Sequence, residues 1–280
     1  MSTPSIGWME AIVLGLVQGL TEFLPVSSSA HLRIIGPILP SGTDPGAAFT
    51  AITQIGTELA VLLYFRRDIA RIVGQWCGSL LGKSTGSNPD ARLGWMIIVG
   101  SLPIGILGLL FQSAIETYLR NLYVTASMLI AFGVLLGIAE RIRVQERSIG
   151  QMRWRDGILF GFAQAMALVP GVSRSGGTIT AGLMMGYTRE AAARYSFLLA
   201  VPAVMASGFF QLYKSWGIAG PVSPFATALA TAVAFIVGYG VIVGFLRIVS
   251  SRGFAPFVYY RIGLGLFLLG LLHNGIIAPM

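Results

Sequence analysis

Two short stretches of this chain place residues that could do chemistry inside otherwise apolar sequence. The first stretch, GLTEFLPVSSSAHL at 19–32, combines a carboxylate, three serines and an imidazole: Glu22, Ser27, Ser28, Ser29 and His31. A serine hydroxyl or an imidazole can act as a nucleophile. A carboxylate or an imidazole can act as the base or the acid that serves it. The first stretch therefore has the groups that cleavage of a phosphate ester requires.

The second stretch, PGVSRSGGTIT at 170–180, has the composition of an anion-binding site around Arg174. The planar guanidinium group matches phosphate oxygens, and backbone N–H groups at a helix start attract anions. Glycine lets the backbone approach a ligand closely. We therefore expect a phosphate cradle here. With the serines of the first stretch, the expected phosphate contacts are Ser27, Ser29, Ser173, Ser175, Gly176 and Thr178.

Two further side chains near these stretches suggest a metal ion or an ion pair. Gln18 and Glu22 are four residues apart and share a helical face, so their oxygens could hold Mg²⁺ or Ca²⁺. Glu58 lies in the middle of an apolar run, where an ionisable residue is energetically costly and is a functional hypothesis by default. Glu58 could pair with Arg174, or it could lie closer to the cytoplasm.

Structural roles compete with these functional ones. Serines after a proline are often only helix caps, and this reading fits Ser27 and Ser29 as well as a site does. A lone histidine in a membrane segment, such as His31, is often only hydrogen-bonded. Arg33 could extend its head group to the membrane surface or touch a lipid head group.

The composition identifies the elements that must position these residues. The chain has 280 residues, of which 55% are hydrophobic and only 11% charged, whereas soluble proteins have about 25% charged residues. Long apolar runs predict an all-α polytopic membrane protein surrounded by membrane lipids. The net charge of +8 comes from arginines between apolar runs, with no basic stripe that contains interleaved aromatics. We therefore expect no nucleic-acid partner.

The apolar runs divide into long and short ones. Four are too short to span a membrane, and they form two adjacent pairs, each broken by a proline and serines. Such a break is tolerated at membrane depth only where it is buried or lines a cavity, so each pair predicts a re-entrant helical hairpin. About six spanning helices remain. The runs are 8–24, 27–39, 47–65, 93–112, 121–139, 157–170, 174–186, 195–213, 225–246 and 258–277.

The order of the runs predicts a single membrane domain, 1–280, built from an inverted repeat. Basic loops are expected in the cytoplasm, among them the one with Arg66, Arg67, Arg71, Lys83 and Arg92, which includes the polar stretch 82–92. Three spans then follow each hairpin, so the second copy must be upside down. The copies are expected at about 1–140 and 150–280, with 15–22 aligned to 157–164. Inverted repeats place broken helices near the midplane, so the two hairpin tips should meet there.

The two stretches closely resemble the signature motifs of the bacterial undecaprenyl-diphosphate phosphatase family, the bacitracin-resistance proteins. ITQIGTELAV at 52–61 and YSFLLAVP at 195–202 also resemble family segments. The resemblance implies hydrolysis of undecaprenyl diphosphate to undecaprenyl phosphate and phosphate, which recycles a lipid carrier for cell-wall synthesis and confers bacitracin resistance. It also implies a polyprenyl diphosphate substrate and a divalent cation. The expected location is the bacterial plasma (inner) membrane, with the active site open to the outer face.

Matched motif by motif, Glu22 resembles the family's catalytic glutamate and Ser28 its proposed nucleophile. His31 resembles the catalytic histidine, and Arg174 resembles the arginine that binds phosphate. We favour Ser28 over His31 as the nucleophile, because His31 lies on the same helical face and could be its base. One position departs from the pattern: Gln18 stands where many members carry a glutamate. A carboxamide is no base and a weaker metal ligand, so Glu22 must carry more of that role.

A transporter or flippase for a phosphorylated lipid or another anion is the main alternative. Inverted repeats with broken helices at the midplane are also transporter architecture. A transporter must bind an anion, but it does not need a nucleophile with a base. The Glu–Ser–His set opposite Arg174 therefore favours the phosphatase. The sequence leaves a homodimer open.

Overall fold

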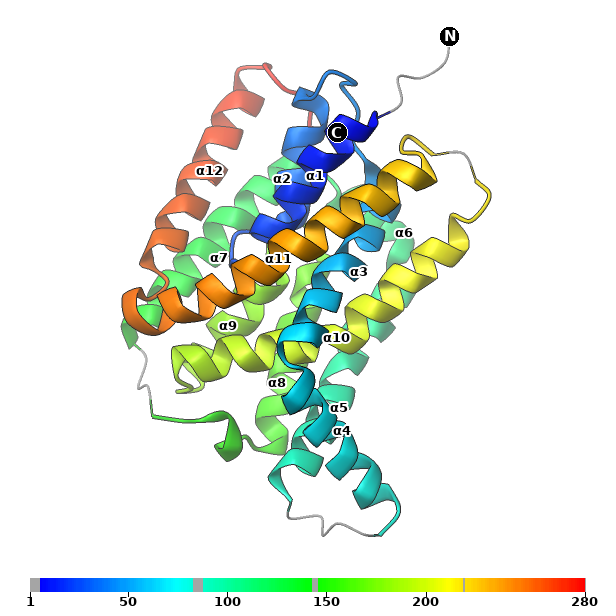
Figure 1. The fold of residues 1–280 in the computed structure, drawn as a ribbon. Helices are drawn as coiled ribbons and strands as arrows, with labels where there is room; N and C mark the ends of the chain where they lie inside the picture. Colours follow the sequence, from blue (N-terminus) through cyan, green and yellow to red (C-terminus); the bar gives the residue numbers. More distant parts are fainter. Residues whose placement is uncertain (1–5, 83–87, 143–145, 219, 280) are drawn as a thin grey trace.

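The computed structural model describes residues 6–82, 88–142, 146–218 and 220–279, and these residues form helices joined by short loops (Figure 1). They contain no β-strand beyond isolated bridges. The segment 83–87 of the expected loop 82–92 lies outside the described residues. The helices are α1 Trp8–Thr21, α2 Ser28–Ile35, α3 Gly46–Tyr64, α4 Arg66–Leu80, α5 Pro89–Leu110, α6 Gln112–Ala114, α7 Leu122–Ile142, α8 Trp154–Ala165, α9 Arg174–Met184, α10 Arg189–Lys214, α11 Pro224–Arg252 and α12 Ala255–His273.

Six of the described helices are long and apolar enough to cross a membrane: α3, α5, α7, α10, α11 and α12. Large apolar side chains lie exposed on them, such as Leu110 on α5 and Phe267 on α12. Lipid is the solvent that such a surface requires. The prediction of an all-α polytopic membrane protein with six spans is confirmed.

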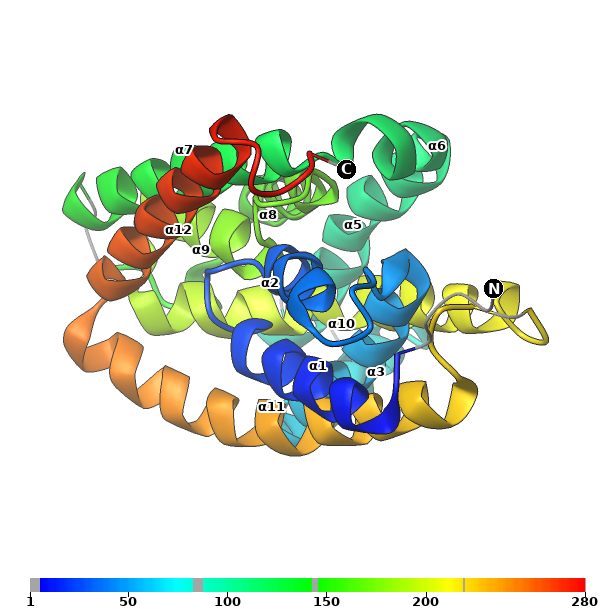
Figure 2. The ribbon, with the colours of Figure 1, turned by 90° about the horizontal axis from the view of Figure 1, so that it is seen from above.

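The short helices form the two expected hairpins. α1 has 14 residues, which span only about 21 Å of a hydrocarbon core about 30 Å thick. In Figure 1, α1 and α2 lie in the upper part of the bundle, whereas α8 and α9 lie in the lower part. Seen from above, α2 lies near the centre of the bundle, with α11 along one edge and α7 along the opposite one (Figure 2). The hairpins thus reach the centre from opposite ends.

Several of the main helix–helix contacts join a helix of the first half of the chain to one of the second half. α1 of the first half packs against α11 of the second, and α8 of the second half packs against α5 of the first. α7 contacts α12, and α3 contacts α10. Such contact between the halves is expected of an inverted repeat, in which equivalent helices pair across the interface. The limits of the repeats near 140 and 150 stay a prediction.

Equivalent positions of the two hairpins are 146 residues apart. α1 and α8 begin at Trp8 and Trp154. Gly15 and Gly161 share this spacing, and an added Cβ on either would lie 2.6 Å from a carbonyl oxygen of the partner helix. The expected alignment of 15–22 with 157–164 was therefore wrong by four residues. The glycines within each segment are four residues apart, at 15 and 19 and at 157 and 161. The two segments were therefore aligned one helical turn out of register.

The region 66–92, expected as a basic loop, contains the helix α4. Its apolar residues have helical spacing, at Ile69, Ile72, Val73, Trp76 and Leu80, and α4 packs against α5. Arg71 ties the two helices together, because its Nε donates to Asp90 Oδ2 at 2.8 Å. The many charges hid this periodicity in the sequence.

The first hairpin tip is anchored in the main apolar core. Phe23, next to Glu22, packs edge to face against Phe197 of α10, with ring centroids 5.3 Å apart. Both rings are buried. Replacing such a ring by alanine costs about 3–5 kcal/mol, so this contact fixes where the following tip residues lie.

Candidate active site

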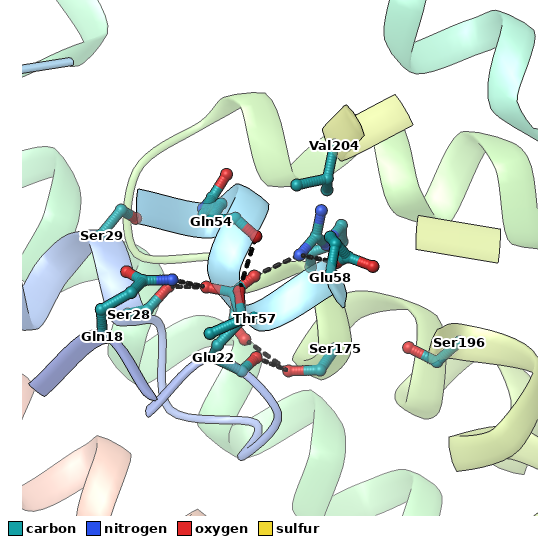
Figure 3. Close-up of polar contacts among 12 residues, drawn as sticks. Gln18, Glu22, Ser28, Ser29, Gln54, Thr57, Glu58, Ser175, Ser196 and Val204 are labelled. Carbon is teal, nitrogen blue, oxygen red and sulfur yellow. Dashed lines mark hydrogen bonds and ion pairs between the residues drawn. The ribbon is translucent and has the colours of Figure 1, made fainter. Parts of the chain in front are cut away.

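The two hairpin tips meet, as expected. Ser175, at the start of α9, donates from its hydroxyl to the carbonyl oxygen of Leu24 in the first tip at 3.0 Å. In Figure 3, the side chains of Gln18, Glu22 and Ser28 converge on one side of the meeting point, and Glu58 lies across from them. The site thus contains residues from α1, α2, α3 and α9.

Both tips use the same unusual backbone conformation. Ser27 and Ser173 have φ angles of 72° and 69°, and among the described residues they are the only non-glycine residues with positive φ. Residues held in this region cost about 1–3 kcal/mol and are concentrated at functional sites. Each precedes a helix, so Ser28 and Arg174 occupy equivalent first positions of α2 and α9.

Ser28 is hydrogen-bonded to a carboxylate. Its Oγ donates to Oε2 of Glu22 at 2.5 Å, and Nε2 of Gln18 donates to the same oxygen at 2.6 Å. Glu22 is only 7% exposed. An ionised carboxylate is only an acceptor, so it can take the hydroxyl proton of Ser28. Such an arrangement is one that a serine nucleophile with a carboxylate base requires, and Gln18 holds the carboxylate in place.

Arg174 joins this pair to a second carboxylate. Its Nη2 contacts Oε1 of Glu22 and also Oε1 of Glu58, the latter at 3.2 Å. Two alternatives were considered for Glu58, and the structure shows the ion pair with Arg174. Among the described residues, both carboxylates contact the same nitrogen, which leaves Nε and Nη1 of the guanidinium group for an anion.

The imidazole of His31 forms no hydrogen bond with Ser28 in this structure. Its Nδ1 lies 2.7 Å from the carbonyl oxygen of Ser27, and its Nε2 lies 2.7 Å from the hydroxyl of Tyr260 on α12. The rings of His31 and Tyr260 also stack, 5.6 Å apart. A carbonyl oxygen only accepts, so we assign the proton of neutral His31 to Nδ1. In this structure Ser28 donates to Glu22 and not to His31, so the hypothesis that His31 is the base of Ser28 stays a prediction.

Tyr260 and the adjacent Arg261 are residues that the sequence interpretation missed. Arg261 is fully buried in α12. A signal was available: a charged residue inside a membrane span is a functional hypothesis by default. Nothing in the sequence, however, indicated which part of the chain this residue contacts.

The other expected phosphate contacts have partners within the protein. Oγ of Ser173 accepts from the backbone N–H of Gly176 at 3.1 Å and so caps α9. Thr178 donates to the carbonyl oxygen of Arg174 at 2.7 Å. Ser29 is exposed, 3.4 Å from Oγ of Ser27. A role in phosphate binding stays a prediction for this set, and Ser173 and Thr178 would have to exchange an internal hydrogen bond for one to the ligand.

Arg33 takes neither of the roles weighed for it. It is buried, and its Nε lies 4.0 Å from a carboxylate oxygen of Asp44, which also accepts from Arg120 at 2.7 Å. Arg33 thus belongs to an ion-pair cluster between α2, the start of α3 and the start of α7.

Two unpaired oxygen atoms among the side chains of the site fit a hard divalent cation. Oε1 of Gln18 and Oε2 of Glu58 are buried oxygens without a hydrogen-bond partner. Such groups are costly to leave unpaired, and oxygen is the ligand atom that Mg²⁺ and Ca²⁺ prefer. Among the described residues, no cluster of three or more His, Cys, Asp or Glu could by itself hold a metal ion. Mg²⁺ is commonly held by one or two carboxylates, water and substrate phosphates, which matches this sparse set.

Comparison with known proteins gives matches along nearly the whole chain. The family model described as "Bacitracin resistance protein BacA" matches residues 11–267, a segment that includes both hairpin tips. "Undecaprenyl-diphosphatase 2" of Agrobacterium fabrum is 66% identical over 274 residues, which cover 98% of this chain and 99% of that protein. "Undecaprenyl-diphosphatase" of Paenarthrobacter aurescens is 63% identical over 276 residues, covering 98% and 100%. The protein of the same name from Micrococcus luteus is 61% identical over 274 residues, covering 97% and 99%.

Proposed function

Because the chain belongs to the bacitracin resistance protein BacA family, we propose that it hydrolyses undecaprenyl diphosphate to undecaprenyl phosphate and phosphate. One observation carries this proposal beyond the similarity: Ser28 is hydrogen-bonded to Glu22, and Glu22 contacts Arg174 from the opposite hairpin. A site in a bundle of membrane spans suits the substrate, whose long apolar tail stays in lipid. Its product would be the carrier lipid of cell-wall synthesis, and its activity would confer bacitracin resistance.

The first step uses the three residues in separate roles. Arg174 holds oxygens of the terminal phosphate through Nε and Nη1. The oxygen of Ser28 attacks the terminal phosphorus, and Glu22 takes the proton of the hydroxyl. The bond from that phosphorus to the bridging oxygen breaks, and its electron pair leaves with undecaprenyl phosphate. Glu22 then returns its proton to solvent or to the departing phosphate.

The second step releases phosphate from Ser28. Glu22 takes a proton from a water molecule whose oxygen attacks the phosphorus, and the bond to the oxygen of Ser28 breaks. Ser28 regains its proton from Glu22, so one water is consumed per turnover and the enzyme returns to its starting state. His31 contacts Tyr260 and the carbonyl oxygen of Ser27, so we assign it to holding the first turn of α2. Direct participation of His31 in catalysis stays a prediction.

We also propose a divalent cation as the cofactor. Glu22, Gln18 and Glu58 would hold Mg²⁺ or Ca²⁺, and the cation would offset the charge of the diphosphate when bound. The two buried oxygens without partners support this assignment.

The distribution of charge supports one orientation in the membrane. The helix α4 and the start of α8 lie in the lower part of the bundle in Figure 1, whereas the first hairpin lies toward the upper end. The helix α4 begins with Arg66 and Arg67, and Arg153 directly precedes α8. Basic residues are enriched on the cytoplasmic side. We therefore place the lower end in the cytoplasm and the chain in the bacterial plasma membrane, with the site open to the outer face.

The transporter alternative has less support. The relatives are named as diphosphatases, and a transporter does not require a serine with a carboxylate base. The Ser28–Glu22 pair therefore favours the hydrolase.

The test is phosphate release from undecaprenyl diphosphate by the purified protein in detergent, with Mg²⁺ or Ca²⁺ present. Ser28→Ala and Arg174→Ala should each reduce kcat by about 10³-fold or more, because they remove the nucleophile and the cation that stabilises the transition state. Ser207→Ala is the matched control, since its hydroxyl bonds only a carbonyl of its own helix, Val204. A folded wild-type protein that releases no phosphate would sink the proposal.

A further inference from the structure

Arg261 of α12 donates hydrogen bonds to both hairpin tips. Its Nη1 donates to the carbonyl oxygen of Pro25 in the first tip at 2.8 Å. Its Nη2 donates to Gly171 and Val172 in the second tip at 2.8 and 2.9 Å. Its Nε donates to the carbonyl oxygen of Leu129 on α7 at 3.2 Å. The side chain is 0% exposed, so it does not reach into solvent.

These carbonyl groups belong to the parts of the hairpins where the helices break. In a membrane, backbone groups outside a helix must find partners within the protein. Arginine suits this task because its planar group carries five donors in a fixed geometry. The bonded residues also precede the reacting ones closely: Pro25 stands three residues before Ser28, and Val172 stands two before Arg174.

Two neighbouring contacts reinforce this arrangement. An added Cβ on Gly176 would lie 2.5 Å from Nη1 of Arg261, so a side chain there would have to displace the guanidinium group. This gives Gly176 a different role from the phosphate contact that its motif predicts. Tyr260, the residue before Arg261, contacts His31 on α2. Adjacent residues of α12 therefore contact the first hairpin at two places, Tyr260 at α2 and Arg261 at the tip that precedes α2.

We infer that Arg261 is a positioning residue that fixes the distance between the two hairpin tips, and through them between Ser28 and Arg174. This inference rests on the proposed function, because it assigns Arg261 a part in the same phosphatase site. Arg261 does not contact the reacting groups. Its removal should therefore leave Ser28, Glu22 and Arg174 present but misplaced.

The kinetic test separates positioning from substrate binding. Arg261→Met keeps much of the side-chain length and removes every donor, and Arg261→Lys keeps the charge on a single nitrogen. A misplacement of about 1 Å can cost about 100-fold in rate, so we expect kcat to fall about 100-fold in Arg261→Met, with KM changed less than about threefold. The kcat of Arg261→Lys should lie between the kcat of Arg261→Met and that of the wild type. Arg66→Met is the matched control, because Arg66 is exposed and bonds only a carbonyl of Leu63.

Two kinetic outcomes would overturn the inference. One is a folded Arg261→Met protein with a kcat equal to that of wild type. The other is a raised KM with an unchanged kcat, which would mean that Arg261 serves substrate binding. Rates are taken per folded protein, well below each variant's Tm, so that a loss of stability alone does not lower kcat.

Hydrogen–deuterium exchange gives a readout that does not depend on activity. If Arg261 holds the tips, Arg261→Met should raise exchange in residues 23–28 and 170–176, while α5 keeps the wild-type rate. Exchange that rises equally over all helices would indicate a general role in stability and overturn the inference. If the wild type released no phosphate, the proposed function would fail, and this exchange pattern would still test Arg261.

Gly176 supplies a coupled test. Gly176→Ala should reduce kcat strongly in the wild type, because the new methyl group displaces Arg261. In the Arg261→Met background, the same change should reduce kcat much less. Equal effects in both backgrounds would show that Gly176 does not make room for Arg261.

Discussion

Glu22 is the residue that joins the two halves of the candidate site, because its two carboxylate oxygens have different partners. Oε2 accepts from Ser28 and Gln18, and Oε1 contacts Arg174. A single side chain thus orients the nucleophile from one hairpin and the arginine from the other. Its loss should affect both at once.

Glu22→Gln should therefore nearly abolish phosphate release. The carboxamide has a similar shape, but it cannot take the proton of Ser28, and general bases contribute about 10²–10⁴-fold to rate. The measurement is kcat with undecaprenyl diphosphate. Glu10→Gln is the control, because the Glu10 carboxylate accepts from Gly7 and Ser41 at the start of α1, away from the tips. A Glu22→Gln protein that keeps its kcat would mean that another group is the base.

Gln18 offers a test of the metal assignment. A carboxylate is a stronger ligand for Mg²⁺ or Ca²⁺ than a carboxamide, and Gln18 already lies against Glu22. Gln18→Glu should therefore lower the cation concentration needed for half-maximal activity by about tenfold, and chelator should abolish activity in both proteins. Gln164, the equivalent residue on α8, is also fully buried, so Gln164→Glu is the matched control. If both variants respond alike, the cation is not held at Gln18.

The motif residues were predictable because their chemistry is local. A carboxylate, a run of serines and an arginine stand out against an apolar background, and Glu22 and Arg174 were identified on that ground. The choice of Ser28 among the three serines came from the family resemblance. The partner of His31 was not predictable, because Tyr260 lies 229 residues away in the chain. The partners of Arg261 were not predictable either, because it donates to backbone carbonyl groups, which every residue has.

The helices bring the tips together through close backbone contacts at glycines. Gly161 of α8 packs on Gly100 of α5, and an added Cβ would lie 2.6 Å from its carbonyl oxygen. Gly105, also on α5, has open space around it. Small residues let membrane helices approach closely, so the two glycines should respond in opposite ways to the same change.

Gly161→Ala should lower both Tm and kcat. The methyl group must push α8 away from α5, which costs about 1–3 kcal/mol, and α8 carries the second tip. Gly105→Ala should leave kcat unchanged and raise stability by up to about 1 kcal/mol, because alanine favours a helix. Thermal unfolding in detergent and phosphate release measure both effects. Equal Tm values for the two variants would contradict the close packing of α8 on α5.

The hairpins were predictable as elements, but their register was not. Proline and serine mark where each helix must break, so the pairs α1–α2 and α8–α9 followed from the sequence. Register depends on which glycine meets which backbone, and glycines one turn apart look alike in a sequence. α4 was missed because its charged residues dominate a run whose apolar spacing is nevertheless helical.

For the whole molecule, the bilayer itself made the architecture predictable. A span must be apolar and about 20 residues long, so hydropathy alone identified the six long helices. The way these helices exchange partners depends on side-chain packing, which hydropathy does not describe. A homodimer stays a prediction. The mass of the protein in detergent, set against 29.8 kDa for one chain, measures it.

The single cysteine of the chain offers a direct test of orientation. Cys77 is exposed on α4, at the end of the bundle that we place in the cytoplasm. A membrane-impermeant maleimide should therefore label it only after the cells are permeabilised. In a Cys77→Ser background, Lys214→Cys at the end of α10 reports the opposite end and should react in intact cells. Gly150→Cys in the same background gives a second cytoplasmic reporter.

The orientation decides where the substrate is hydrolysed. Charge asymmetry puts the basic end inside because arginine and lysine are retained there during insertion. If Cys77 and Gly150→Cys react in intact cells while Lys214→Cys does not, the molecule is inverted, and the first hairpin enters from the cytoplasm. The chemistry of Ser28, Glu22 and Arg174 would be unchanged, but its diphosphate would have to come from the inner leaflet. Labelling in the order that we expect leaves the outer leaflet as the source of the diphosphate.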